Sequence, residues 1–140
     1  RPPAVDADRR ELQAAIDGYN KLISRLSEVQ DVQRWPTEAA ILRNCYFGRA
    51  DALFDLGKYE EAIEAYSAAT NRYQHDPESL EAYVQIGCCQ RRLGRISEAR
   101  GTLEQARVVL QRINAEANFK GTTRLARQDW VHLLDWLRAL

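Results

Sequence analysis

Hydrophobic side chains recur every three or four residues along most of this chain, a spacing that predicts amphipathic α-helices. The first apolar stripe falls within residues 8–31 and contains Leu12, Ala15, Ile16, Tyr19, Leu22, Ile23, Leu26 and Val29. Gly18 lies inside this stripe, where glycine costs about 1 kcal/mol relative to alanine. We therefore expect a neighbouring helix to come close to the chain at Gly18.

Glycine, proline and polar residues divide the remainder of the chain into five further helices. The pattern predicts them over residues 37–56, 59–73, 77–93, 96–117 and 122–140, with a break at 118–122. Gly57 and Gly94 each follow a helix and can take the left-handed conformation of a C-terminal cap. Asp76 and Pro77 together form a typical helix start, because Asp can cap free amides and proline has no N–H to satisfy.

The last predicted helix has an apolar face and offers a second candidate interface. Ala126, Trp130, Leu133, Leu134 and Leu137 share that face, and Thr122 or Thr123 can cap the first turn. Leu125, Trp136 and Leu140 flank the face rather than join it. An exposed tryptophan favours a partner, so self-association through this helix is one hypothesis. The alternative is that Trp136 covers the preceding helix pair or a domain outside this segment.

Helix-turn-helix units repeat along the chain with a period of 37 residues. This spacing separates Tyr46 from Tyr83, Gly57 from Gly94, Ala62 from Ala99, and Ala69 from Ala106. A period of this length is typical of a solenoid, in which each helical hairpin covers the apolar face of the next. The small residues Ala50, Ala62, Gly87 and Ala99 are expected where two helices cross closely.

The repeat resembles the tetratricopeptide repeat family. Tyr46, Ala50, Leu53, Gly57, Tyr59, Ala62, Tyr66 and Ala69 match its pattern, and Tyr83, Ile86, Gly87, Gly94, Ala99 and Ala106 continue it in a second unit. The resemblance implies an all-α, right-handed α-solenoid of about six helices forming one domain, 1–140. Its parts would be a half-repeat helix at 8–31, repeats at 37–75 and 77–117, and a capping helix at 122–140.

The three residues by which the period exceeds the usual family length fall at 71–76. Arg72 and Tyr73, followed by Pro77, Ser79 and Ala82, are similar to repeats of bacterial envelope-assembly lipoproteins and periplasmic division-coordinating proteins. The family resemblance implies a non-enzymatic protein-interaction module. A soluble segment of the cytoplasm or of a bacterial periplasm fits this interpretation.

In the family, the first helices of successive repeats line a concave groove that holds a peptide or a partner's helix. Carried over to this chain, the partner-binding residues would be Asn44, Phe47, Asp51, Phe54, Val84, Arg91 and Arg92, with Asp55, Glu81 and Cys88 beside them. The alternative for Phe47 and Phe54 is packing under the first helix. Arg91 and Arg92 could instead be a solvated pair that complements the helix dipole.

The overall charge and the cysteine and histidine residues argue against several classes of function. Twenty Lys and Arg balance twenty Asp and Glu, so no basic field favours nucleic acid. No apolar run is long enough to span a membrane, and the chain has no methionine, so we interpret it as an excised segment. Cys45, Cys88 and Cys89 lack metal-site spacing, and His75 and His132 lack a nucleophile with an orienting partner. We expect no catalysis, cofactor or metal.

Overall fold

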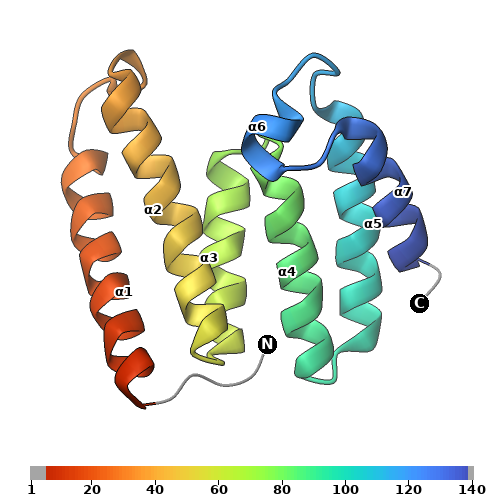
Figure 1. Cartoon of the computed structure of the whole chain (residues 1–140), viewed down its shortest axis with the longest axis horizontal. Helices are drawn as coiled ribbons and strands as arrows, with labels where there is room; N and C mark the ends of the chain where they lie inside the picture. The colour runs from red at the N-terminus through yellow and green to blue at the C-terminus, as the bar shows by residue number, and fades with distance from the viewer. Residues whose placement is uncertain (1–5, 139–140) are drawn as a thin grey trace. The chain divides into compact units, whose positions relative to one another are not determined.

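The computed structural model describes residues 6–138, with side chains from residue 8 onward. In this range the chain forms seven α-helices and one short 3-10 helix (Figure 1). Their bounds are α1 Asp6–Ser27, η1 Val32–Arg34, α2 Pro36–Asp55, α3 Tyr59–Arg72, α4 Glu78–Arg92, α5 Ile96–Arg112, α6 Phe119–Thr123 and α7 Arg127–Arg138. The all-α prediction is confirmed, and α6 is an additional helix. Contacts divide the chain into two compact units, Arg1–Ala69 and Thr70–Leu140.

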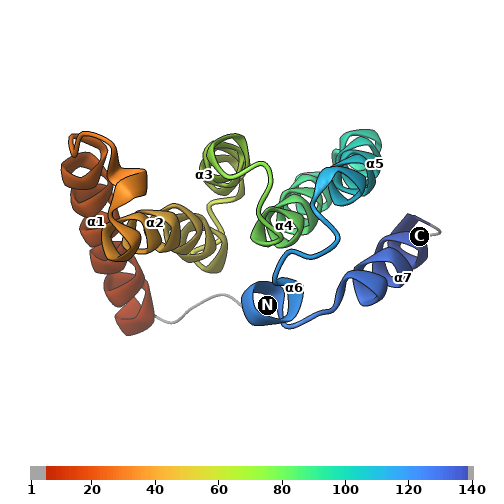
Figure 2. The ribbon, with the colours of Figure 1, turned by 90° about the horizontal axis from the view of Figure 1, so that it is seen from above.

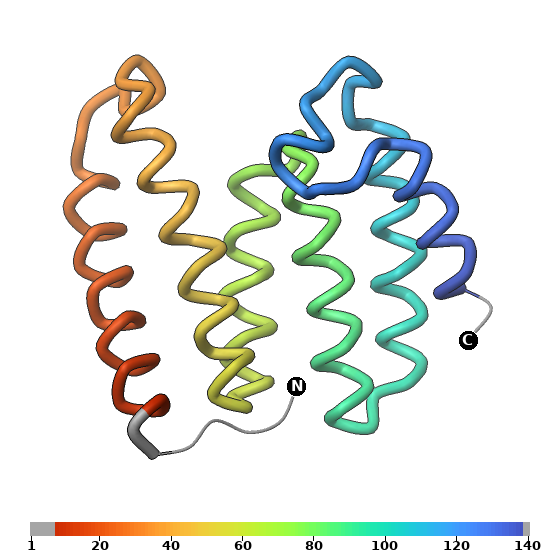
Figure 3. Tube along the Cα trace, viewed as in Figure 1, coloured from red at the N-terminus to blue at the C-terminus, as the bar shows by residue number. Residues whose placement is uncertain are grey.

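In the first unit, α1 and α2 run antiparallel and side by side (Figure 3). Pro36 opens α2, where its missing N–H leaves no donor unsatisfied. Gly57 ends the helix at a φ of 76°, the left-handed cap that the sequence predicts. The apolar stripe of α1 contacts α2 with only part of its width, because Ile16 is 5% exposed while Leu22 is 42% exposed.

The expected close approach at Gly18 is wrong. A Cβ built on Gly18 would meet no atom within 4 Å, whereas a Cβ on Gly48 of α2 would lie 2.8 Å from Cζ of Tyr19. The tyrosine ring next to Gly18 thus lies against the glycine of the partner helix. The apolar stripe correctly predicts that Gly18 lies on a helix. It does not predict the direction of the Tyr19 side chain, which crowds Gly48 rather than Gly18.

In the second unit, α4 and α5 form an antiparallel hairpin whose turn contains Gly94 at a φ of 79°. Figure 2 shows α6 beside α4 and α7 beside α5, so the last segments cover one side of this hairpin. A single buried cluster joins all four helices: Leu80, Ala106, Leu110, Ile113, Phe119, Trp130 and Leu134. The final helix therefore closes this core, as its apolar face predicts.

Two details of this closing region differ from the sequence-based expectation. The helix expected to reach residue 117 ends at Arg112, because Ile113 turns into extended backbone and its side chain enters the buried cluster. The expected break at 118–122 instead contains α6, whose N-cap Asn118 accepts a 2.9 Å hydrogen bond from the Gly121 N–H through Oδ1. A short helix with its own cap thus carries Phe119 into the core.

Thr123 does not cap the last helix. Its hydroxyl donates to the Phe119 carbonyl at 2.7 Å and accepts from the Trp130 indole N–H at 2.9 Å. At the start of α7 the Asp129 carboxylate accepts from the Ala126 N–H at 3.1 Å instead. The threonine therefore fixes the chain between α6 and α7 rather than the helix end.

Candidate partner-binding surfaces

The predicted binding residues on α2 differ in how much of each side chain reaches solvent. Asn44 and Asp51 are exposed, and Phe47, between them on the same helical face, is half-buried. Phe54 is only 6% exposed, and its ring packs edge-on against Tyr59 with centroids 5.6 Å apart. A partner could reach the first three side chains, while Phe54 contributes to the packing of α2 on α3.

Asp51 has a defined partner within the first unit. One carboxylate oxygen accepts a 2.5 Å hydrogen bond from the hydroxyl of Tyr66 on α3, a residue that is 1% exposed. Because Tyr66 is fixed in the core, this bond orients the Asp51 carboxylate at the surface. The Asp51 carboxylate is therefore held in one orientation and does not rotate freely in solvent.

The predicted binding residues on α4 also divide into buried and exposed groups. Val84 packs against the buried cluster of the second unit, and Cys88 is half-buried. Arg91 and Arg92 are exposed in the last turn of the helix, where a cation interacts favourably with the helix dipole. The charged end of α4 is thus the part of this surface that a partner could contact.

The last helix carries one strongly exposed aromatic side chain. Trp136 is 62% exposed on α7, whereas Leu125 packs against the buried cluster. Leu140, the third residue expected at this surface, lies outside the described residues. Ion pairs between Arg107 and Asp135 and between Arg138 and Glu104, each 3.2 Å long, hold α7 on α5.

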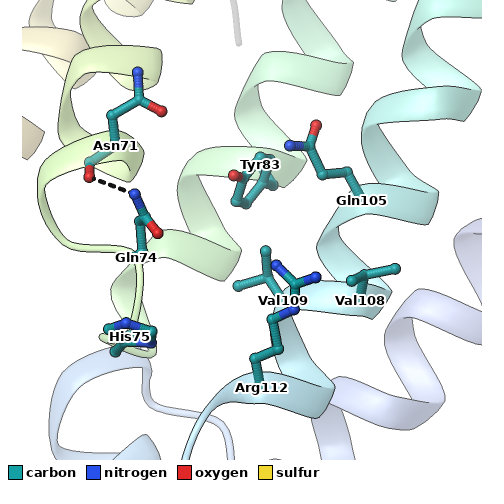
Figure 4. Close-up of a pocket in the computed structure, with 8 residues that line it drawn as sticks. All are labelled: Asn71, Gln74, His75, Tyr83, Gln105, Val108, Val109 and Arg112. Carbon is teal, nitrogen blue, oxygen red and sulfur yellow. Dashed lines mark hydrogen bonds between the residues drawn. The ribbon is translucent and has the colours of Figure 1, made fainter.

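A pocket of about 240 Å³ lies in the second unit at a place that sequence reasoning missed (Figure 4). Asn71 at the end of α3 forms one wall with Gln74 and His75 of the following turn, and Tyr83 of α4 forms another. Four residues of α5 complete it: Gln105, Val108, Val109 and Arg112. The three extra residues of the repeat period, at 71–76, were the one signal that pointed to this turn.

The cysteines are free thiols with different surroundings. Cys45 and Cys89 are 3% and 0% exposed, and Cys88 is half-buried. Burial raises the pKa of the Cys45 thiol, and it raises the pKa of Cys89 to about 12 with a smaller contribution from neighbouring Cys88. Between residues 8 and 138, no group of three or more His, Cys, Asp and Glu side chains is arranged to hold a metal ion.

The family model for the tetratricopeptide repeat matches residues 38–111, which is more than half of the chain and runs from the first turn of α2 to the last turn of α5. The chain belongs to the tetratricopeptide repeat family. Tetratricopeptide repeats generally mediate protein–protein interactions and are generally non-enzymatic. Searches of curated proteins and of solved structures found no match. The resemblance to the bacterial envelope-assembly type of repeat stays a prediction.

Within the tetratricopeptide repeat, small residues are expected where the helices of each matched pair cross. Ala50, Ala62 and Ala99 are 0–2% exposed, and a Cβ on Gly87 would lie 3.7 Å from the Leu103 side chain, an ordinary contact distance. Gly87 therefore faces α5, as expected for a helix crossing, while the place of the three buried alanines at crossings stays a prediction. No helix among the described residues is both long and apolar enough to cross a membrane.

Proposed function

We propose that this tetratricopeptide repeat chain binds a peptide or a helix of another protein through side chains of α2 and α4, and that it catalyses no reaction. The observation that supports the proposal most is the exposure of Arg91 and Arg92 at the end of α4. Arginine forms paired hydrogen bonds to a carboxylate, which suits recognition of an acidic side chain in a partner.

The α2 surface complements this charge with other kinds of contact. Asn44 is exposed one turn before Phe47, and Asp51 follows Phe47 by four residues, so the three side chains share one helical face. The asparagine amide can pair with a partner's main chain, and the half-buried phenylalanine ring offers an apolar contact. An apolar residue of a partner suits the α2 surface, and an acidic residue of a partner suits the end of α4.

A peptide library tests the proposal with ligands of many sequences at once. Peptides selected on the immobilised chain are labelled, and their dissociation constants are measured by fluorescence anisotropy with wild type, Phe47→Ala and Arg91→Ala. The proposal predicts micromolar peptides whose affinity falls about fivefold or more in either variant. Arg100→Ala, an exposed arginine on α5, is the matched control and should bind like wild type.

Thermal melting of each variant shows whether the fold is intact. Equal affinities of wild type, Phe47→Ala and Arg91→Ala for every selected peptide would contradict the proposal. So would the absence of any peptide that binds more tightly than about 100 μM, which corresponds to a binding free energy of about −5.5 kcal/mol.

Self-association through α7 is the second candidate function, and the 62% exposure of Trp136 favours it. Tryptophan is enriched at protein–protein interfaces relative to the rest of the surface. Light scattering of the wild type and of Trp136→Ser tests it. A mass above the monomer that falls to the monomer in the variant supports self-association, and a monomer at all concentrations in both excludes it.

A further inference from the structure

The pocket between the turn after α3 and the end of α5 is a cavity that the proposed groove surface does not include. Tyr83 lines this pocket, whereas Val84, Arg91 and Arg92 belong to the surface proposed above. Successive helical residues are about 100° and 1.5 Å apart, so Tyr83 lies about 180° around α4 from Arg92. Arg91 lies only about 80° from Tyr83 around the helix, but about 12 Å further along it. The pocket is therefore separated from the charged end of α4 mainly by distance along the helix.

The charges of the pocket favour an anionic group. Among the eight residues that line it, Arg112 is a cation and no side chain is a carboxylate. The Arg112 guanidinium and the Tyr83 hydroxyl make no hydrogen bond or ion pair with the side chains of residues 8–138. Both groups can therefore donate to a ligand without first losing a protein partner.

The remaining lining adds an apolar floor and oriented amides. Val108 is 45% exposed, and Val109 and Arg112 line the same pocket from α5 (Figure 4). The Gln74 amide nitrogen donates to the Asn71 carbonyl at 3.0 Å, which leaves its oxygen as an acceptor toward the pocket. An apolar group and an anion can thus bind next to each other.

The volume indicates what kind of ligand fits. Pockets for whole small molecules usually measure about 300–1,000 Å³, and this one measures about 240 Å³. It holds one or two side chains more readily than a complete metabolite. Members of this repeat family generally bind proteins, so the occupant is a segment of a partner protein.

We infer that this pocket is a second docking site, which takes an aliphatic side chain and a neighbouring Asp or Glu from an extended segment of a partner protein. The aliphatic group lies on Val108 and Val109, and the carboxylate receives hydrogen bonds from Arg112 and Tyr83. The site is independent of the α2 and α4 surfaces, so it can be present whether or not those surfaces bind.

Two capped decapeptides test the inference, one alternating glutamate with leucine and one alternating glutamine with leucine. Each is titrated to about 1 mM into the ¹⁵N-labelled chain, a concentration that detects even weak binding. The glutamate peptide should shift the amide signals of His75, Val108 and Arg112, with a dissociation constant at least about fivefold below that of the glutamine peptide. Succinate at the same concentration should not reproduce the shifts.

Three variants locate the binding. Arg112→Gln should weaken the glutamate peptide by about fivefold, and Arg100→Gln, on the same helix but outside the pocket, should leave binding unchanged. Val108→Glu places a carboxylate four residues before Arg112, where the two side chains can pair. This exposed substitution should abolish binding, because the new acid occupies Arg112 and repels the peptide.

The inference is overturned by any of four results. These are no shift with the glutamate peptide, equal affinity for the glutamine peptide, unchanged binding by Val108→Glu, and the same shifts with succinate, which would mark a small-anion site. Shifts confined to Asn44 and Arg91 would also overturn it while supporting the proposed function, so the two ideas fail separately.

Discussion

Trp130 donates its indole N–H to the hydroxyl of Thr123 at 2.9 Å, inside the core that α4, α5, α6 and α7 share. Trp130 is 2% exposed and Thr123 is 4% exposed, so water cannot easily replace either partner. The same hydroxyl donates to the Phe119 carbonyl at 2.7 Å. One side chain therefore links the end of α6 to the first turns of α7.

Replacing Thr123 by valine should lower the free energy of unfolding of the chain by about 1–3 kcal/mol. Valine keeps the shape of threonine but leaves the Trp130 N–H buried without an acceptor. Thr123→Ser, which keeps the hydroxyl, should lose clearly less. Urea unfolding followed by tryptophan fluorescence measures both. A loss in Thr123→Ser that exceeds the loss in Thr123→Val would mean that the methyl group, rather than the hydrogen bond, matters at this position.

Alanine at Gly18 and alanine at Gly48 should have different effects on stability. Gly18→Ala should raise the free energy of unfolding by about 1 kcal/mol, because alanine favours the helix and its Cβ meets no atom within 4 Å. Gly48→Ala should fail to gain this amount, because its Cβ would lie 2.8 Å from the Tyr19 ring. Thermal melting of both variants compares them directly.

The Tyr19→Ala background separates crowding from helix propensity. Without the ring, Gly48→Ala should recover the stabilisation that Gly18→Ala shows. If Gly48→Ala has the same effect with and without Tyr19, the two residues are not coupled and the packing of α1 on α2 differs from that described.

The buried thiol of Cys89 should make the fold less stable at alkaline pH. In the unfolded chain this thiol ionises near its ordinary pKa of 9.0, while burial raises the folded pKa to about 12. Between these values the folded state keeps the proton that the unfolded state releases. The free energy of unfolding therefore falls as pH rises above about 9, by at most about 1.4 kcal/mol per pH unit.

Urea unfolding under reducing conditions at about pH 8 and about pH 10.5 measures this loss. The decrease between the two pH values should be smaller in Cys89→Ala than in wild type, whereas Cys88→Ala, at the half-buried neighbour, should keep most of it. An identical decrease in wild type and Cys89→Ala would assign the alkaline destabilisation to other groups.

The helical hairpins could be predicted because glycine and proline residues mark the ends of their helices. Gly57 and Gly94 adopt the left-handed backbone, at φ values of 76° and 79°, that glycine at a helix end indicates. Pro36 begins α2 because proline has no N–H to satisfy in the first turn of a helix, and this preference can be recognised in the sequence. These signals act within a few residues of the position that they determine, so they do not depend on the tertiary structure.

Features that depend on contacts between distant residues could not be predicted in the same way. No glycine or proline marks the end of α5, where the burial of Ile113 turns the chain. The pocket brings together Asn71, Tyr83 and Arg112 from separate elements, and no periodic pattern connects them. The burial of Phe54 against Tyr59 likewise depends on how α3 packs on α2.

The most direct test of the central proposal is a charge reversal at Arg91 with a matched reversal in a library-selected peptide. The proposal predicts that Arg91→Glu weakens the acidic peptide by about fivefold or more, and that the same peptide with lysine in place of its acid binds Arg91→Glu more tightly than wild type. Unchanged affinity of Arg91→Glu for the acidic peptide, with an unchanged melting temperature, would contradict binding through the end of α4.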